Sequence, residues 1–526
     1  MDMFKVLARG AKIRGKHQND LELFRQTPKT SFRKEHDLER KLHFFSKPAK
    51  RTVQVSKAPE DDLDNVELVI NSEEDAASHR ASHRIKVTGT DLPLPIASFT
   101  DLVRLANPQP PVLRNLERLG FSDPTPIQSE AIPALSNHRD LIACAPTGSG
   151  KTLAFVIPII NSIAAMKNKG VKAVIVSPTR ELATQIYEVA VQTSRGLDLS
   201  IGVVNKSLLA KLRNNNAGAK QHMDLVISTP LRLIEALKTQ LLDLSTTQFL
   251  VLDEADRLLG DGFVEQTDEI VASCTNNSLV KAIFSATMPA NVEDLANSIM
   301  HSAVRVIVGY KEAASDTIEQ SLQFCGNEHG KLHAIRQMLT GGEVVPPILV
   351  FVQSIARAKA LFHELLYDKV NVDVIHSELT QNQRDRVVNN FKQGDIWVLI
   401  CTDVLARGID FHGVNLVINY DVPQNGQAYV HRIGRTGRAG RKGKAVTLYT
   451  KQDVATLRPI LNIMKQSGCE ISDWLLESTR QRKNKRNIIE RDQISTVPRV
   501  FKKQRKRKQE IIEGSKRRAQ KSSAKE

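Results

Sequence analysis

The 526-residue sequence lacks paired cysteines and long apolar runs. Its five cysteines lie far apart, their number is odd, and no C-x-x-C pair occurs. This usage argues against a disulfide framework or a zinc site and favours a reducing compartment. No uninterrupted apolar run approaches the roughly 18 residues of a membrane span, and the start MDMFKVLARGAKIRGK is too charged for a secretory signal. We therefore expect a soluble intracellular protein with no membrane partner.

Positive charge is concentrated at one end of the chain. The net charge is +16, yet residues 96–479 hold 38 basic and 38 acidic side chains. Residues 480–526 hold 18 Lys and Arg against 5 Asp and Glu. Such a tail has few large apolar residues to bury, so we predict an extended segment whose partner is a polyanion. A solubilising tail or a nuclear-import signal is the alternative, and the two uses are compatible.

Short apolar runs separated by helical stretches begin after residue 95, and no short-period repeat is visible. This alternation predicts buried parallel sheets in an α/β fold. Two series of strands are expected, at 140–145, 172–178, 224–229, 249–256, 281–287 and 304–309, and then at 321–326, 347–354, 372–377, 397–403, 414–421 and 445–450. We predict two tandem domains, at 96–309 and 321–475, joined by a polar linker at 310–320. Residues 1–95 are expected to be a largely disordered N-terminal extension and residues 476–526 a basic tail.

The stretch LIACAPTGSGKT (141–152) resembles a phosphate-binding loop except at its head, where Ala145 replaces glycine. The head position needs only a small side chain. Between a strand and a helix, Gly148 and Gly150 let backbone N–H groups surround phosphate oxygens at a helix N-terminus. Lys151 would reach the β and γ phosphates, and Thr152 would ligate Mg²⁺. A glycine-rich structural turn is the alternative, and the strand before and helix after favour the nucleotide site.

A group of carboxylates directly follows the apolar run LVL at 250–252. Asp253 and Glu254 would lie at the C-terminal edge of a strand, where α/β sheets bind ligands. Asp253 would hold Mg²⁺ through its water shell, and Glu254 would orient and deprotonate the attacking water. An acidic helix cap at Asp256 or Asp253 is the alternative, but it does not explain two carboxylates after a buried strand.

Over about residues 97–475 the chain resembles the DEAD-box RNA helicases, which are ATPases with two RecA-like domains. The resemblance depends on an ordered series of motifs. These are GFSDPTPIQ (120–128), APTGSGKT (145–152), PTREL (178–182), DEAD (253–256), SAT (285–287), TDVLARGID (402–410) and HRIGRTGR (431–438).

The resemblance implies a site for ATP and Mg²⁺. Gln128 would hydrogen-bond the adenine edge, and Phe121 with Phe99 would pack the base. The remaining nucleotide contacts would come from Ala145, Pro146, Thr147, Gly148, Ser149, Gly150, Lys151, Thr152 and Asp410.

The resemblance also implies that hydrolysis requires both domains. Arg435 and Arg438 would be arginine fingers, which stabilise the charge that spreads over the transferred phosphoryl group and are worth about 10³ to 10⁵ in rate. Because both lie in the second domain, the active site would exist only when the domains close. Ser285 and Thr287, hydrogen-bonded to the DEAD segment that includes Asp256, would couple hydrolysis to closure. His431 would join the same network; a packed interface histidine is the alternative.

RNA is the ligand expected to favour closure. The resemblance implies contacts mainly to phosphates and 2′-hydroxyls, which select RNA over DNA without reading sequence. The implied residues are Pro178, Thr179, Arg180, Thr229, Arg232, Gln381, Arg384 and Thr402. Two departures from the family pattern affect this surface: VVNKS (203–207) replaces a Gly-Gly pair, and TPLR (229–232) replaces TPGR. Lys206 would substitute a charge contact for the lost backbone approach.

The flanking segments narrow the resemblance. MDMFKVLARGAK, residues 83–102 and TPLRL resemble the Rok-type subgroup, which implies a nucleolar protein of the nucleus that acts on pre-rRNA and snoRNA duplexes with ribosome-assembly factors. Nothing in the sequence suggests an oligomer, so we expect a monomeric core. An ATP-gated RNA clamp or scaffold, a DEAD-box helicase of another RNA pathway, and a DNA translocase are the other hypotheses.

Overall fold

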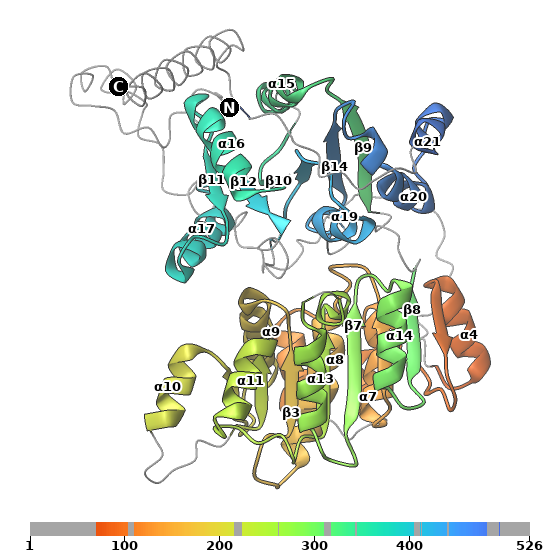
Figure 1. Ribbon diagram of the computed structural model, residues 1–526. Helices are drawn as coiled ribbons and strands as arrows, with labels where there is room; N and C mark the ends of the chain where they lie inside the picture. The colour runs from red at the N-terminus through yellow and green to blue at the C-terminus, as the bar shows by residue number, and fades with distance from the viewer. Residues whose placement is uncertain are drawn as a thin grey trace, which may run out of the picture.

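The computed structural model describes residues 70–103, 110–214, 223–260, 262–309, 317–341, 344–403, 411, 413–438, 441–480 and 494. Within these residues the chain forms two α/β domains, one above the other in Figure 1, each with its own sheet. The predicted fold class is confirmed. No helix among the described residues is long and apolar enough to cross a membrane.

The first domain contains an eight-stranded sheet in the order β1-β8-β2-β7-β6-β3-β5-β4. All neighbouring strands are parallel except β1, which pairs antiparallel with β8. The strands are β1 (Ile85–Thr88), β2 (Leu141–Cys144), β3 (Ala173–Val176), β4 (Ile201–Val203), β5 (Leu225–Ser228), β6 (Phe249–Asp253), β7 (Val280–Ser285) and β8 (Val304–Val308). Strands β2, β3, β5 and β6 are buried along their whole length, as expected for a parallel sheet covered on both faces.

Helices cover both faces of this sheet. They are α4 (Glu73–Ser82), α6 (Pro110–Arg118), α7 (Pro126–Ser136), α8 (Lys151–Ala165), α9 (Arg180–Thr193), α10 (Lys206–Asn214), α11 (Pro230–Lys238), α12 (Ala255–Leu258), α13 (Val264–Ser273) and α14 (Ala290–Ile299), with the 3₁₀ turn η2 (Phe99–Asp101).

The register of the first sheet brings three predicted motifs together. Cys144 at the end of β2 pairs with Ser285 at the end of β7. Asp253 at the end of β6 pairs with Phe284, also on β7. The phosphate-binding loop, the SAT segment and the DEAD segment therefore leave the sheet side by side at one edge.

The second domain contains a six-stranded parallel sheet in the order β11-β12-β10-β13-β14-β9. Its strands are β9 (Ile318–Phe324), β10 (Ile348–Val352), β11 (Val372–Ile375), β12 (Val398–Thr402), β13 (Leu416–Asn419) and β14 (Gly443–Tyr449). The helices are α15 (Glu328–Thr340), α16 (Ile355–Tyr367), α17 (Gln381–Gln393), α19 (Gly426–Ile433), α20 (Arg458–Gln466) and α21 (Asp473–Arg480), with the 3₁₀ turn η3 (Val454–Thr456). Helix α19 lies on the side that faces the first domain (Figure 1).

The hydrophobic cores stay within the domains. Two clusters of buried side chains flank the first sheet and two flank the second. No cluster among the described residues contains side chains from both domains. The two domains are therefore held together by something other than a shared apolar core.

Three predicted boundaries are wrong. The folded first domain begins before residue 96, because α4 and β1 lie within the expected disordered extension and β1 continues the sheet. Strand β9 begins at Ile318, inside the predicted linker, because its backbone pairs with β14 from that residue. At the other end, α21 runs to Arg480 and Ile494 is buried against the second core, so the domain continues past residue 475. Residues 1–69 and, apart from Ile494, residues 481–526 lie outside the described residues.

Candidate active site

The phosphate-binding loop joins β2 to α8. Gly148 and Gly150 have φ values of 81° and 89°, a left-handed backbone that glycine adopts without a Cβ clash. Lys151 begins α8 and donates from Nζ to the carbonyl oxygens of Ala145 and Pro146, at 2.6 and 3.0 Å. Burial lowers the pKa of this lysine, against the opposing charge of Asp253. The structure thus has the curled loop and helix N-terminus that phosphate binding requires, and the Ala145 side chain is accommodated as a buried group.

Gln128 contacts the end of this loop. Its Oε1 accepts a hydrogen bond from the Thr125 backbone N–H at 2.9 Å, and its Nε2 donates to the Gly150 carbonyl at 2.9 Å. Of the two predicted aromatic residues, Phe121 is 42% exposed, whereas Phe99 is 5% exposed and belongs to the first core. The structure therefore places Gln128 beside the nucleotide loop, leaves Phe121 accessible, and gives Phe99 a packing role.

Asp253 and Glu254 lie where β6 ends. The Asp253 Oδ1 atom accepts a hydrogen bond from the Glu254 backbone N–H at 2.9 Å. Burial raises the pKa of Asp253 to about 7; the neighbouring charge of Glu254 adds to this rise and Lys151 opposes it. Glu254 has a φ of 49°, and its Oε2 is buried without a hydrogen-bond partner among the described residues. These two carboxylates are therefore poorly neutralised by the protein, as expected where a cation and a water molecule bind.

Asp256 and the SAT segment form one hydrogen-bonded unit. Thr287 donates from Oγ1 to Asp256 Oδ2 at 2.5 Å, and the Asp256 backbone N–H donates to Ser285 Oγ at 3.3 Å. Ser285 also accepts, at its carbonyl, the Ala145 backbone N–H at 3.1 Å. The three motifs are thus connected through direct bonds, in the arrangement that the coupling role requires.

Side chains of the second domain complete this unit. His431 on α19 lies with Nε2 2.6 Å from Asp256 Oδ2, and Gln427 donates from Nε2 to the same oxygen at 2.7 Å. Burial alone would raise the pKa of Asp256, but the charge of His431 and the hydrogen bonds from His431, Thr287 and Gln427 hold that pKa well below its usual range. With Asp256 ionised, the shared proton belongs on His431 Nε2.

The phosphate-binding loop also touches the end of α19. Thr147 donates from Oγ1 to the Gly434 carbonyl at 3.1 Å. A Cβ built on Gly148 would lie 2.9 Å from Cγ of Arg438, so this arginine lies against the loop. Arg435 is 4% exposed and donates from Nε to the His431 carbonyl at 3.1 Å. Asp410, the remaining predicted nucleotide contact, lies outside the described residues.

The predicted RNA contacts lie at the starts of three helices and the end of one strand. Pro178, Thr179 and Arg180 lead into α9, Thr229 and Arg232 begin α11, Gln381 and Arg384 begin α17, and Thr402 ends β12. Strands β3 and β5 are neighbours, so α9 and α11 begin side by side. Helix N-termini with free backbone N–H groups suit phosphate oxygens.

Arg384 has a second contact that the sequence did not indicate. Its Nη1 atom donates to Glu181 Oε1 at 3.1 Å, which joins α17 of the second domain to α9 of the first. Both side chains are largely buried, at 19% and 12% exposure. Arg384 therefore contributes to the domain interface in addition to its expected place on the RNA surface.

The two departures from the family pattern have visible structural effects. Asn205 accepts the Leu208 backbone N–H at 2.8 Å and so precedes α10, which begins at Lys206. The Lys206 side chain is exposed, and Leu231 is 62% exposed at the start of α11. Both substitutions thus change the surface beside the predicted RNA path rather than the core.

Sequence reasoning missed Gln427, Glu181 and Gly434. Each makes a contact between domains, and such contacts join positions more than 170 residues apart. Glu181 lies inside the PTREL motif, which was a usable signal. Gln427 lies four residues before His431 on α19, and helical spacing predicts that the two share a face.

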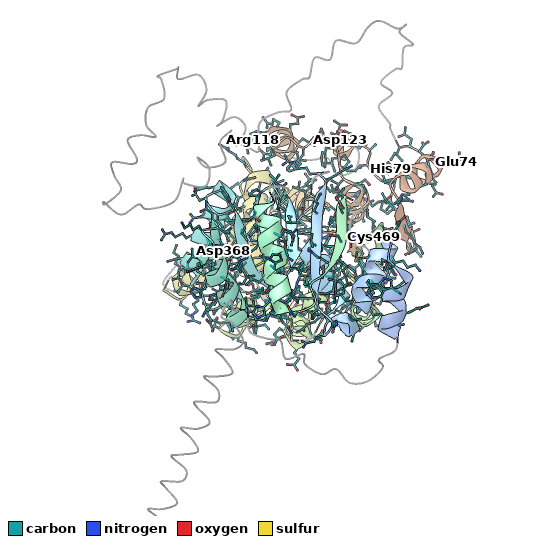
Figure 2. All side chains as sticks on the ribbon, turned by 90° about the horizontal axis from the view of Figure 1, so that it is seen from above. Glu74, His79, Arg118, Asp123, Asp368 and Cys469 are labelled. Carbon is teal, nitrogen blue, oxygen red and sulfur yellow. The ribbon has the colours of Figure 1, made fainter. Side chains whose placement is uncertain are left out.

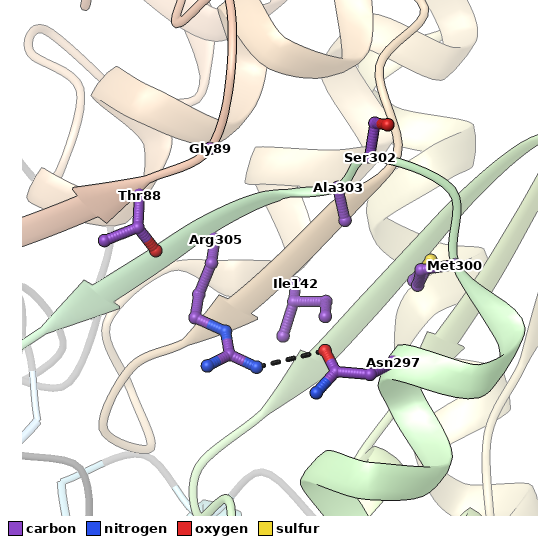
Figure 3. A pocket seen from close by; sticks show the side chains of 8 residues that line it. All are labelled: Thr88, Gly89, Ile142, Asn297, Met300, Ser302, Ala303 and Arg305. Carbon is purple, nitrogen blue, oxygen red and sulfur yellow. Dashed lines mark hydrogen bonds between the residues drawn. The ribbon is translucent and has the colours of Figure 1, made fainter.

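A separate pocket of about 330 Å³ lies at the β1 edge of the first sheet (Figure 3). It contains none of the predicted site residues. Arg305 in this pocket donates from Nη2 to Asn297 Oδ1 at 3.2 Å (Figure 3). Its Nη1 atom also forms an ion pair with Glu293. The pocket is lined by Thr88, Gly89, Ile142, Asn297, Met300, Ser302, Ala303 and Arg305.

Comparison with known proteins identifies similar chains over both domains. The family described as DEAD/DEAH box helicase matches residues 125–295, and the helicase conserved C-terminal domain matches residues 330–440. The ATP-dependent RNA helicase ROK1 of Lodderomyces elongisporus is 51% identical over 99% of this chain and 99% of its own. ROK1 of Saccharomyces cerevisiae is 49% identical over 96% of each chain. Among solved structures, S. cerevisiae Dbp5 bound to RNA and ADP BeF3 is 28% identical, with a TM-score of 0.63 over 73% of this chain and 98% of that one.

Proposed function

This chain belongs to the DEAD/DEAH box helicase family and is an ATP-dependent RNA helicase, and from this premise we propose that it remodels RNA duplexes during assembly of the small ribosomal subunit. The proposed substrates are pre-rRNA duplexes, including those formed with snoRNA, and the proposed location is the nucleolus. The similarity to ROK1 helicases over nearly the full chain supports this proposal, as do the flanking segments that resemble the Rok-type subgroup.

We propose that ATP binds between the domains, with its phosphates in the loop from Ala145 to Thr152. Gln128 would select adenine, because its amide already contacts Gly150 and retains a further N–H and lone pair for a base edge. Arg438 would reach the γ-phosphate region, since it lies against Gly148.

The residues present fit a Mg²⁺ ion. Thr152 supplies a hydroxyl and Asp253 a carboxylate, a donor set in which water and phosphate oxygens complete the coordination. The raised pKa of Asp253 and the unpartnered Oε2 of Glu254 indicate a place where the protein alone leaves negative charge uncompensated. A bound Mg²⁺ would neutralise charge on the β and γ phosphates. Glu254 would accept the proton of the attacking water.

The observation that carries the proposal is the convergence on Asp256 Oδ2. Thr287 of the first domain and His431 and Gln427 of the second all contact this oxygen within 2.7 Å. An RNA strand that contacts α9, α11 and α17 would favour the closed arrangement, and closure would complete the hydrolytic site. Hydrolysis and release of phosphate would remove the nucleotide contacts and let the domains part.

Crosslinking of the full-length protein to RNA in cells tests the proposed substrate. We expect enrichment of small-subunit pre-rRNA and of snoRNA, and the enrichment should increase for Glu254→Gln, which retains ATP and RNA. Recovery of other RNA classes at equal levels would assign the helicase to another RNA pathway. RNA release that is equally fast with ATP and with a non-hydrolysable analogue would favour an ATP-gated clamp.

A further inference from the structure

Residues 72–96 form a strap against the first domain, here called the N-terminal strap. It consists of α4, β1 and the turn that follows. Ser72 caps α4 through a reciprocal pair of bonds with Asp75, and Ala76 is fully buried under the helix. Figure 2 places Glu74 and His79 on α4 at the rim of the domain. β1 extends the sheet beside β8, so backbone pairing holds the middle of the strap to the domain.

The N-terminal strap contacts α7, the helix that contains Gln128. Arg80 forms two parallel hydrogen bonds with Glu130, from Nε to Oε1 at 2.7 Å and from Nη2 to Oε2 at 3.0 Å. The same Nη2 also donates to the Pro93 carbonyl at 3.2 Å, inside the strap. The Glu130 side chain is 2% exposed and that of Arg80 19%. A forked pair of this kind fixes both distance and orientation.

Ser129, between Gln128 and Glu130, also contacts the N-terminal strap. The Ser129 carbonyl accepts a hydrogen bond from the Ile96 backbone N–H at 3.0 Å, and the Ser129 Oγ atom lies 3.4 Å from His79 Nε2. Residues two apart on a helix are rotated by about 200°, so Gln128 and Glu130 face nearly opposite ways. Gln128 accordingly faces the Gly150 carbonyl and Glu130 faces Arg80. Helix α7 is therefore held between the phosphate-binding loop and the N-terminal strap.

We propose that Arg80 and Glu130 are positioning residues for adenine recognition: their ion pair sets the placement of α7 and through it the Gln128 amide. A buried carboxylate gives α7 one preferred position, because any displacement would leave that charge without its partner. The inference rests on the proposed role of Gln128. It adds the N-terminal strap, which lies outside the phosphate-binding loop, to the parts of the protein that determine nucleotide binding.

The test measures RNA-stimulated hydrolysis by the full-length protein with ATP and with GTP. Arg80→Ala and Glu130→Gln should each raise the KM for ATP about three- to tenfold, the loss expected when one hydrogen bond to the ligand is weakened. The kcat at saturating ATP should change less than about twofold, because the phosphate site is intact. The KM for GTP should stay constant, because guanine does not present the edge that Gln128 recognises. Arg114→Ala is the matched control, since this arginine is exposed and, among the described residues, bonds only to the Pro110 carbonyl of its own helix.

Melting temperatures separate positioning from stability alone. A lower melting temperature with an unchanged KM for ATP, measured well below unfolding, would overturn the proposal. If Arg80→Ala does not fold, Glu130→Gln decides, because it keeps the shape of the side chain. Gln128→Ala is measured in parallel. If this variant leaves the KM for ATP unchanged, the proposed adenine site itself is wrong. If Gln128→Ala raises the KM for ATP but the Arg80 and Glu130 variants do not, only the positioning role of the N-terminal strap is rejected.

Discussion

The Oδ2 atom of Asp256 in the first domain lies 2.6 Å from Nε2 of His431 in the second. Both residues are buried, at 3% and 2% exposure. A charged carboxylate in such surroundings needs hydrogen-bond donors, and two of those that contact Asp256, on His431 and Gln427, come from the other domain. When the domains separate, Asp256 loses these donors, so the pair links the conformation of the protein to the state of its DEAD segment.

Replacing His431 with alanine should uncouple RNA from hydrolysis. A charge-assisted hydrogen bond contributes about 1.5–3 kcal/mol, so RNA-stimulated kcat should fall about ten- to a hundredfold. The rate without RNA should change less, because the open form does not use this bond. Steady-state ATPase rates with and without single-stranded RNA measure the difference. Equal losses in both rates would contradict the coupling role.

Gln427 should make a smaller contribution of the same kind. Gln427→Ala removes a neutral donor to the ionised Asp256. A hydrogen bond to a charged group is worth about 1.5–3 kcal/mol, and at the low end of this range we expect about a tenfold rise in the RNA concentration that gives half-maximal ATPase. Gln424→Ala is the control, because Gln424 is exposed in the loop just before α19. Identical behaviour of the two variants would show that the Gln427 bond is incidental.

Lys151→Ala and Glu254→Gln should both abolish RNA-stimulated hydrolysis while preserving the fold. Loss of the general base is expected to lower kcat about 10²- to 10⁴-fold. The two variants should differ in binding: Lys151→Ala weakens ATP binding, whereas Glu254→Gln retains it. Fluorescent-nucleotide titration and circular dichroism give the two readouts. Full activity in either variant would refute the proposed catalytic assignment.

The stability of the nucleotide-free protein should depend on pH through Asp253. Its pKa is raised from an ordinary 3.8 to about 7, so the folded protein holds a proton that the unfolded chain has released between these values. The free energy of unfolding therefore falls as pH rises through this window, by up to about 4 kcal/mol. Asp253→Asn should remove this cost and melt at a higher temperature than the natural protein at pH 8. The difference in melting temperature between the two proteins should vanish near pH 4. Thermal unfolding in EDTA at several pH values measures this difference. A difference that does not change with pH would contradict a raised pKa for Asp253.

The Arg384–Glu181 pair should contribute to closure. Arg384→Ala and Glu181→Ala should each raise the RNA concentration for half-maximal ATPase, and the double variant should be no worse than the more damaging single one. For a partly buried pair the coupling energy should be about 1 kcal/mol. Strictly additive effects in this double-mutant cycle would show that the Arg384–Glu181 pair does not contribute to closure, and that Arg384 acts only through its contact with RNA.

Much of this fold could be predicted from apolar runs. Each of the predicted strands exists, because a parallel strand buried on both faces must be apolar throughout, and β6 or β10 could hardly be anything else. The missed elements carry weak local signals. Helix α4 buries only Ala76 and contains no large apolar residue, and β1 has four residues whose partner, β8, lies more than 200 residues away. Their formation depends on tertiary contacts that composition does not reveal.

The site was predictable where one motif supplies both the residue and its neighbour. The loop around Lys151 and the carboxylates after β6 could be located from a strand followed by the right side chains. The meeting of Gln427 with Asp256, and of Arg80 with Glu130, could not, because each pair joins separate segments whose approach is fixed by packing.

The absence of an apolar cluster shared by the two domains, among the residues described, has a consequence for repeated turnover. Where the two domains meet, the identified contacts are hydrogen bonds and ion pairs, as between Thr147 and Gly434. Water can replace such bonds when the domains separate, and little apolar surface becomes exposed to solvent. The two domains can therefore separate in each ATP cycle while exposing little apolar surface to other macromolecules.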